Sequence, residues 1–173
     1  MFKKISFIIV AVLMFSGVFS QEKMALKDGK VIPATEMWVF TSNSYSYSGK
    51  VNVQIGKNDK SGVLLLQVQV SEPDFKISGT VYLFLEDGNV ITCTDKNLKA
   101  VVNKDIMAYY TLTPAEISSL KKQKITDVRF RIVGNEKQFS SPIGYFTAHN
   151  KIKSVGLADK TYDTQEAIQQ LFM

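Results

Sequence analysis

Apolar and polar side chains alternate along several short stretches of the chain, and this alternation restricts the fold more than any other feature of the sequence. Successive side chains of a β-strand point to opposite faces, so a period of two indicates a strand with one buried face. Gly56 and Gly62 separate two such stretches, so we predict an antiparallel hairpin with a long loop over residues 56–62. The alternating apolar positions of the hairpin are Val51, Val53 and Ile55, then Leu64, Leu66, Val68 and Val70.

Further strands are predicted on both sides of this hairpin. Residues 80–85 are apolar on both faces, so we predict that this strand lies centrally and is covered on both sides. Residues 21–34 are largely polar and contain Pro33, which indicates an N-terminal arm or an edge strand. The remaining predicted strands are residues 37–40, 90–94, 105–112 and 144–148.

A short helix with a capped start is predicted after residue 112. Thr113 and Glu116 have the spacing of a capping box, in which each side chain accepts a hydrogen bond from the backbone N–H of the other residue. Pro114 occupies the first helical position, where its missing N–H costs nothing. Ile117 and Leu120 are three residues apart and therefore face the same way.

This helix is predicted to lead directly into a strand. Lys121 and Lys122 are expected in its last turn, where cations suit the negative end of the helix dipole. Alternation then resumes, which indicates a strand with one buried and one solvated face. Its apolar side chains are Val128, Phe130 and Ile132, and its polar ones are Asp127, Arg129 and Arg131.

A second short helix is predicted at the end of the chain, over residues 164–173. Thr164 is its expected cap, and Ile168, Leu171 and Phe172 have helical spacing, so the helix should dock on the domain or on a partner. The predicted fold is mainly β: an antiparallel β-sandwich of about seven to nine strands forming a single domain over residues 21–173. A closed β-barrel is the alternative, and it requires the first and last strands to pair.

Residues 1–20 have the features of a signal peptide. Lys3 and Lys4 precede an apolar run of 15 residues from Ile5 to Phe19, which is shorter than the roughly 20 residues of a membrane-spanning helix. Ser20 is a small residue suited to the position before the cleaved bond. We therefore expect a product that begins at Gln21, is periplasmic or secreted, and has no stable membrane span.

The charge of the chain argues against a nucleic-acid partner. The formal net charge is +5, but removal of the leader reduces 21 basic residues to 19 against 16 acidic ones, which leaves +3. The basic residues are spread through both halves of the chain, with one local concentration at Lys121, Lys122 and Lys124. A solvated helix end explains these lysines better than a nucleic-acid surface does.

The sequence has few of the cysteine and histidine residues from which most nucleophilic and zinc sites are built. Cys93 is the only cysteine and His149 the only histidine, and neither lies in a nucleophile motif. One cysteine and one histidine also fall short of the three or four protein ligands of a zinc site. We expect neither a catalytic residue nor a cofactor, and we expect Cys93 to be buried, because an exposed lone thiol is a liability in an oxidising compartment.

Carboxylates offer a weaker alternative. Glu86, Asp87 and Asp95 flank one predicted hairpin and would serve a calcium ion or a glycosidase if they converged. Solvated strand ends explain Glu86 and Asp95 better, and Asp87 with Gly88 forms a turn signal.

Aromatic residues are the more promising group for ligand contact. Tyr45 and Tyr47 alternate with serines, and Trp38 is the only tryptophan. Together with Tyr109 and Tyr110 they would form a platform for the apolar faces of sugar rings, although core packing explains most of them equally well.

The segment of residues 109–132 resembles a pattern that recurs in small uncharacterised exported proteins of Bacteroidota. The residues that carry it are Tyr109-Tyr110-Thr111-Leu112-Thr113-Pro114-Ala115-Glu116-Ile117, Leu120-Lys121-Lys122, and Ile125-Thr126-Asp127-Val128-Arg129-Phe130. In those proteins a strand enters a helix through a threonine cap and a strand of the form I-x-x-[IV]-R follows. The resemblance implies a periplasmic or surface β-domain and no particular activity.

These features favour a non-enzymatic exported β-domain that binds a partner protein or a cell-envelope component. The first alternative is a carbohydrate- or small-ligand-binding module that uses Tyr45, Tyr47 and Trp38. The second is a hydrolase that uses Glu86 or Asp95.

Overall fold

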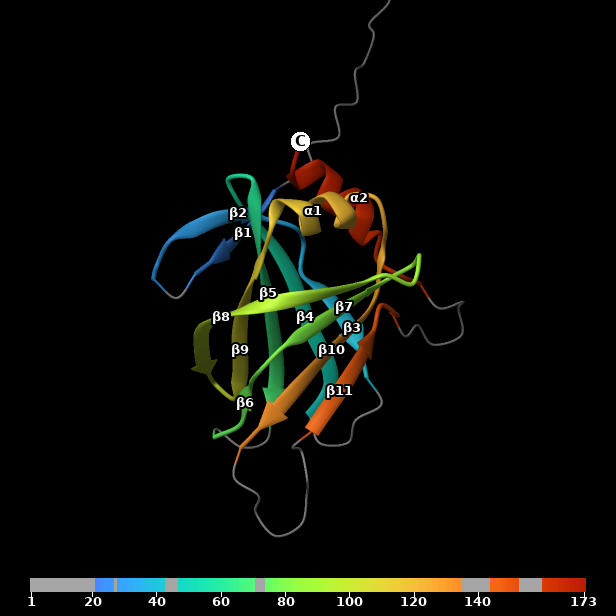
Figure 1. The fold of residues 1–173 in the computed structure, drawn as a ribbon. Helices are drawn as coiled ribbons and strands as arrows, with labels where there is room; N and C mark the ends of the chain where they lie inside the picture. The colour runs from blue at the N-terminus through green and yellow to red at the C-terminus, as the bar shows by residue number, and fades with distance from the viewer. Residues whose placement is uncertain (1–20, 27, 43–46, 71–73, 135–143, 153–159) are drawn as a thin grey trace, which may run out of the picture.

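Alternating apolar side chains of eight antiparallel strands point into one shared interior, and the strands close into a barrel (Figure 1). The computed structural model describes residues 21–26, 28–42, 47–70, 74–134, 144–152 and 160–173. The barrel strands are β3 (Trp38–Thr41), β4 (Tyr47–Asn58), β5 (Ser61–Val70), β7 (Val81–Leu85), β8 (Val90–Val102), β9 (Asp105–Leu112), β10 (Ile125–Val133) and β11 (Gly144–His149). They pair in the order β4-β3-β11-β10-β7-β8-β9-β5, and β5 pairs with β4 again.

The predicted sandwich is therefore wrong, and the alternative of a closed barrel is correct. Closure comes from β3 and β11, the first and last barrel strands in the chain, which pair at Thr41 and His149. Just beyond this bridge, the Asn150 N–H donates to the Thr126 carbonyl at 2.8 Å. The hydroxyl of Thr41 donates to the Lys151 carbonyl at 3.2 Å. The Thr41–His149 bridge and the Thr41–Lys151 hydrogen bond join segments that are more than 100 residues apart, so local patterns in the sequence gave no sign of them.

Large side chains fill the barrel. Trp38, Phe40, Tyr110 and Phe130 are fully buried in one continuous core. An eight-stranded barrel has an interior just wide enough for side chains to fill. Burial of side chains of this size contributes roughly 1.5–3 kcal/mol each, so the filled interior is the main source of stability.

Two helices cover one end of the barrel (Figure 1). Helix α1 (Pro114–Leu120) begins with the predicted capping box: the Thr113 N–H donates to the Glu116 carboxylate at 2.6 Å, and the Glu116 N–H donates to the Thr113 hydroxyl at 3.3 Å. Ile117 and Leu120 face the same way, as predicted, and both are buried in the barrel core. The placement of the lysines was wrong, because α1 ends at Leu120 and Lys121 is already its C-cap.

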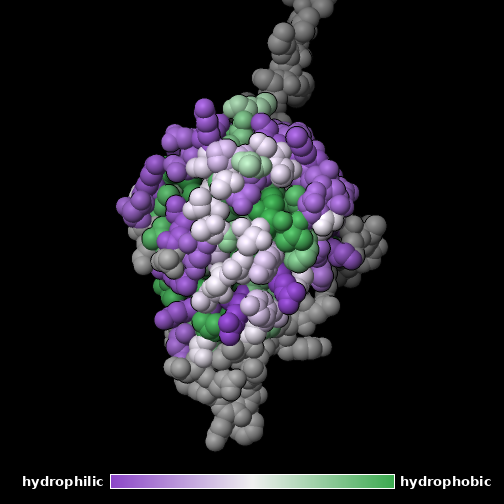
Figure 2. Space-filling model, viewed as in Figure 1, coloured by the Kyte–Doolittle hydropathy of each residue, from purple (hydrophilic) through white to green (hydrophobic). Residues whose placement is uncertain are grey.

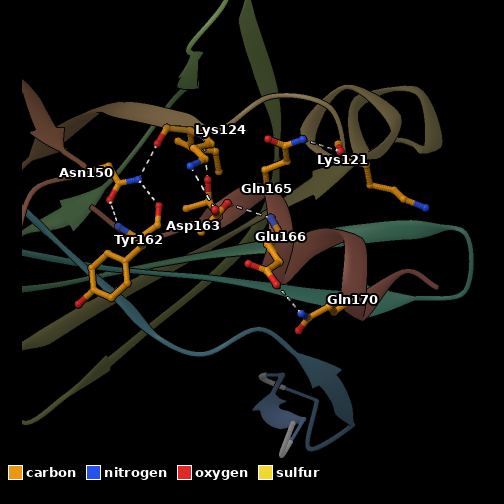
Figure 3. A network of polar contacts seen from close by, with 10 residues as sticks. Lys121, Lys124, Asn150, Tyr162, Asp163, Gln165, Glu166 and Gln170 are labelled. Atoms are coloured by element: carbon orange, nitrogen blue, oxygen red, sulfur yellow. Dashed lines mark hydrogen bonds and ion pairs between the residues drawn. The ribbon is translucent and has the colours of Figure 1, made fainter. Parts of the chain in front are cut away.

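Helix α2 (Thr164–Leu171) packs beside α1 and docks on its own barrel. Its N-cap is Asp163 and not the predicted Thr164; the Thr164 hydroxyl is buried and accepts the N–H of Ile125 at 2.8 Å. Figure 3 shows Asp163 also in contact with Lys124, at 3.1 Å. Ile168 and Leu171 complete the apolar seal at this end of the barrel.

A hairpin outside the barrel covers one part of its wall. Strands β1 (Glu22–Ala25) and β2 (Val31–Ala34) form the predicted N-terminal arm, and β2 joins β4 at Ala34 and Gly56. Met24 and Ile32 of the arm pack on Leu65 and Tyr109, which face outward from the barrel. The arm thus buries a second, smaller apolar cluster on this side.

The predicted long loop over residues 56–62 was wrong. Strands β4 and β5 continue through Gly56 and Gly62 and turn at Asp59, whose φ is +55°. Both glycines serve close packing instead: a Cβ on Gly56 would lie 2.5 Å from Ile32 Cδ1, and one on Gly62 would lie 2.7 Å from Ile117 Cδ1. A glycine in a strand can mark such a close approach as well as a turn.

Strand β7 is central, as predicted, because it lies between β8 and β10. The expectation that both its faces are covered was wrong. Val81, Leu83 and Leu85 point into the core, whereas Tyr82 and Phe84 point outward and are only half-buried. The short strand β6 (Lys76–Ile77) pairs with the far end of β10. The outward rings of Tyr82 and Phe84 give the barrel wall an aromatic outer face.

Asn150 is expected to hold together the end of β11, the start of β10 and the segment before α2. Its side-chain amide donates to the carbonyls of Ile125 at 2.9 Å and Tyr162 at 3.0 Å, and accepts the N–H of Tyr162 at 2.9 Å (Figure 3). Asn150→Ala should reduce the free energy of unfolding by about 2–3 kcal/mol, because it leaves buried polar groups unpaired. Urea unfolding followed by Trp38 fluorescence measures this. The exposed variant Thr92→Ala should change it by less than about 0.5 kcal/mol, and an equally small effect of Asn150→Ala would contradict the assigned role.

The cap of α2 predicts a pH-dependent contribution to stability. The hydrogen bond from the Glu166 N–H lowers the pKa of Asp163 below its ordinary 3.8, and Lys124 adds to this. The carboxylate therefore stabilises the folded state above that ordinary value, and the stabilisation is lost as the pH falls through the lowered pKa. Asp163→Ala should be about 1 kcal/mol less stable than wild type at neutral pH, a gap that narrows in acid, whereas Asp163→Asn should keep most of the cap. A gap between wild type and Asp163→Ala that does not change with pH would contradict this.

Candidate functional site

Four neighbouring strands, β8, β7, β10 and β11, present a continuous outer face on which side chains align in cross-strand rows. Residues that pair in an antiparallel ladder point to the same face of the sheet. The first row is Val90, Phe84, Asp127 and His149; the second is Thr92, Tyr82, Arg129 and Thr147; the third is Arg131 and Tyr145. We call these ten residues the aromatic–arginine face.

Two arginines share one tyrosine on this face. The guanidinium carbon of Arg129 lies 5.1 Å from the centre of the Tyr145 ring, and that of Arg131 lies 5.7 Å from it. All three side chains are exposed, and Tyr145 has 57% of its surface accessible. Each cation–π contact contributes roughly 0.5–1 kcal/mol at an exposed site, and together they hold two like charges near each other.

The single carboxylate of the aromatic–arginine face is already paired. Asp127 lies two residues before Arg129, and its carboxylate contacts Nδ1 of His149 across the β10–β11 ladder. Among the described residues, neither Arg129 nor Arg131 has a carboxylate partner. The pair of guanidinium groups can therefore bind an anion, and their planar geometry suits bidentate contact with a carboxylate, sulfate or phosphate.

Apolar surface adjoins this charged region. Phe84 pairs across the ladder with Val90, which is 46% exposed. Figure 2 looks onto this side of the barrel and shows a green hydrophobic patch beside a broad band of near-neutral side chains, with hydrophilic groups around them. Arginine and aromatic side chains together are the groups most enriched at the centres of binding surfaces.

The aromatic residues suggested by the sequence do not form one platform. Trp38 is fully buried inside the barrel, and its indole N–H has no acceptor among the described residues. Tyr109 and Tyr110 are also buried, and the Tyr110 hydroxyl donates to the Gly79 carbonyl at 3.3 Å. Tyr45 lies outside the described residues, as does the side chain of Tyr47, whose backbone begins β4.

The candidate acids do not converge. Glu86 and Asp87 lie in the turn between β7 and β8, where Asp87 accepts the N–H of Asn89 at 3.0 Å. Asp95 lies five residues into β8, roughly 16 Å farther along the strand, and forms an ion pair with Lys99 at 3.5 Å. Within the described ranges, no three acidic, histidine or cysteine side chains are grouped so that they could hold a metal ion.

Cys93 and His149 lie on opposite sides of the barrel wall. Cys93 is buried, as predicted, and burial raises the pKa of its thiol far above the ordinary value, with a smaller contribution from Glu116. His149 lies on the outer face with Asp127. The arrangement therefore brings no cysteine nucleophile to the histidine.

Sequence reasoning assigned Arg129 and Arg131 only to a solvated face and missed their site. One signal was present: residues 80–85 are apolar on both faces, yet the sequence predicts only two short helices that could cover them. The partner of the arginines, Tyr145, lies on β11, and its position opposite Arg131 depends on the register of the β10–β11 ladder. That register is a tertiary feature and has no local sequence pattern.

No family model matches the chain, and no curated protein or solved structure matches it either. No helix of the described residues is long and apolar enough to cross a membrane. The predicted leader, residues 1–20, lies outside the described residues.

The burial of Cys93 predicts slow reaction with thiol reagents. In the native protein, labelling by a maleimide at pH 8 should be at least about 100-fold slower than in urea-unfolded protein, because the reactive thiolate is disfavoured and shielded. Mass spectrometry after timed quenching measures both rates. Equal rates would show that the wall between β7 and β9 opens or that Cys93 faces outward.

Proposed function

We propose that this protein is a non-enzymatic exported binding domain and that the aromatic–arginine face holds an anionic partner or envelope component. The observation that carries the proposal is the exposed Arg129–Tyr145–Arg131 cluster, whose two guanidinium groups have no carboxylate partner among the described residues. The predicted leader and the resemblance to exported proteins of Bacteroidota support an envelope or extracellular setting.

Rigidity of the barrel wall supports the same function. The binding side chains lie on strands whose opposite faces carry fully buried residues such as Leu83, Val128 and Phe130. Side chains anchored on a packed sheet lose less conformational freedom on binding than side chains on loops, so more of the contact energy appears as affinity. The closed barrel thus acts as a scaffold, and the contacts are made outside it.

Two acidic polymers test this function: sodium polygalacturonate and poly-L-glutamate, each immobilised on a sensor surface. Wild-type protein should bind at least one of them saturably, and added salt should weaken the binding. The double variant Arg129→Gln/Arg131→Gln should bind at least about tenfold more weakly, because it loses two charge-assisted contacts.

A charge-matched variant separates a site from general attraction. Lys60 and Lys122 are exposed and lie outside the aromatic–arginine face, and Lys60→Gln/Lys122→Gln removes the same two charges. This control should change the affinity by less than about twofold. An equal loss of affinity in both double variants would show that the binding depends on net charge and not on this site. Absence of binding to either polymer would overturn the proposed function.

A further inference from the structure

We infer that the ligand of the aromatic–arginine face is a polysaccharide whose sugar rings carry carboxylates, the chemistry of a uronic acid chain. This inference rests on the proposed function and names the class of anion that the face takes. It depends on the position of the aromatic rings relative to the arginines and on the pairing of the strands that carry them.

Aromatic rings and arginines alternate across neighbouring strands. Tyr82 and Phe84 are two residues apart on β7 and point outward, and Tyr82 lies directly opposite Arg129 on β10. Residues opposite each other in an antiparallel pair have Cβ atoms about 5 Å apart, close to the width of one sugar ring. The Arg129 guanidinium lies over Tyr145 of β11, so a sugar stacked on Tyr82 reaches it with a ring carboxylate that points across β10 toward β11.

Hydroxyl groups flank this pair in the same row. Thr92 and Thr147 occupy the two ends of the row that contains Tyr82 and Arg129. Threonine hydroxyls both donate and accept hydrogen bonds, which matches the hydroxyls of a sugar. Arg131 and Tyr145 in the next row offer a second cation and a second ring, as a chain of repeating charged sugars requires.

An extended acidic peptide fits this face less well. Such peptides usually gain affinity by adding a strand to a free sheet edge or by entering a groove. Strand β7 is paired with both β8 and β10, and β10 with both β7 and β11, so their backbone groups are already engaged. A polysaccharide needs no backbone partner, because it binds through ring faces, hydroxyls and carboxylates.

Three soluble probes of equal chain length test the inference: an oligogalacturonate, its methyl ester, which has the same rings without the charge, and an oligoglutamate. Calorimetry on the full chain should give the tightest binding for the oligogalacturonate. The methyl ester and the oligoglutamate should each bind at least about tenfold more weakly, because the first lacks the carboxylates and the second lacks the ring faces.

A second set of variants tests the aromatic rings. Tyr82→Leu/Phe84→Leu keeps apolar volume and removes the rings, so it should weaken oligogalacturonate binding about fivefold or more and leave oligoglutamate binding unchanged. Val101 and Val102 are exposed near the end of β8, and Val101→Ala/Val102→Ala should alter neither. Trp38 fluorescence confirms that each variant keeps the folded barrel.

The outcomes separate the two proposals. Oligoglutamate binding as tight as oligogalacturonate binding, with both dependent on Arg129 and Arg131, would overturn the polysaccharide and leave an anion-binding face for an acidic protein. Binding of the methyl ester as tight as that of the acid would also overturn the carboxylate requirement. Failure of all three probes to bind would overturn both the inference and the proposed function.

Discussion

Pairing of β3 with β11 is the contact on which the rest of the structure depends. This pairing is narrow, with one bridge between Thr41 and His149 and a flanking hydrogen bond from the Thr41 hydroxyl to the Lys151 carbonyl. It turns a ladder of strands into a ring, and a ring has no free edges that must be protected from aggregation. Closure also gives the large apolar side chains a common interior, so the pairing and the packing of the core stabilise each other.

The same closure explains why function is best assigned to the outer wall. Because side chains fill the interior of the eight strands, a partner is contacted from outside, and the two helices and the β1–β2 hairpin cover only part of that outside. Strands β7, β8, β10 and β11 keep an outer face that carries Tyr82, Phe84 and Tyr145 beside two arginines. Exposed aromatic rings are costly in water, and two cations near one ring repel each other. An anion with an apolar face would cover the exposed rings and neutralise the repulsion between the two arginines.

Much of the secondary structure was predictable because its determinants are local. The capping box of Thr113 and Glu116 and the alternation from Val128 to Ile132 needed only neighbouring residues, and both are confirmed. The long loop failed because Gly56 and Gly62 make room for Ile32 and Ile117, which lie far away in the chain. The cap of the last helix was misplaced by one residue because Thr164 is used by the backbone of Ile125, another distant contact.

Sandwich and barrel could not be separated from the sequence for the same reason: both have alternating strands, and they differ only in whether the outermost strands meet. Closure is therefore tested most directly by nuclear Overhauser contacts across the β3–β11 seam in solution. A closed barrel predicts contacts between the backbone protons of Thr41 and His149. Absence of the Thr41–His149 contacts would contradict the closed barrel and the outer face built on it.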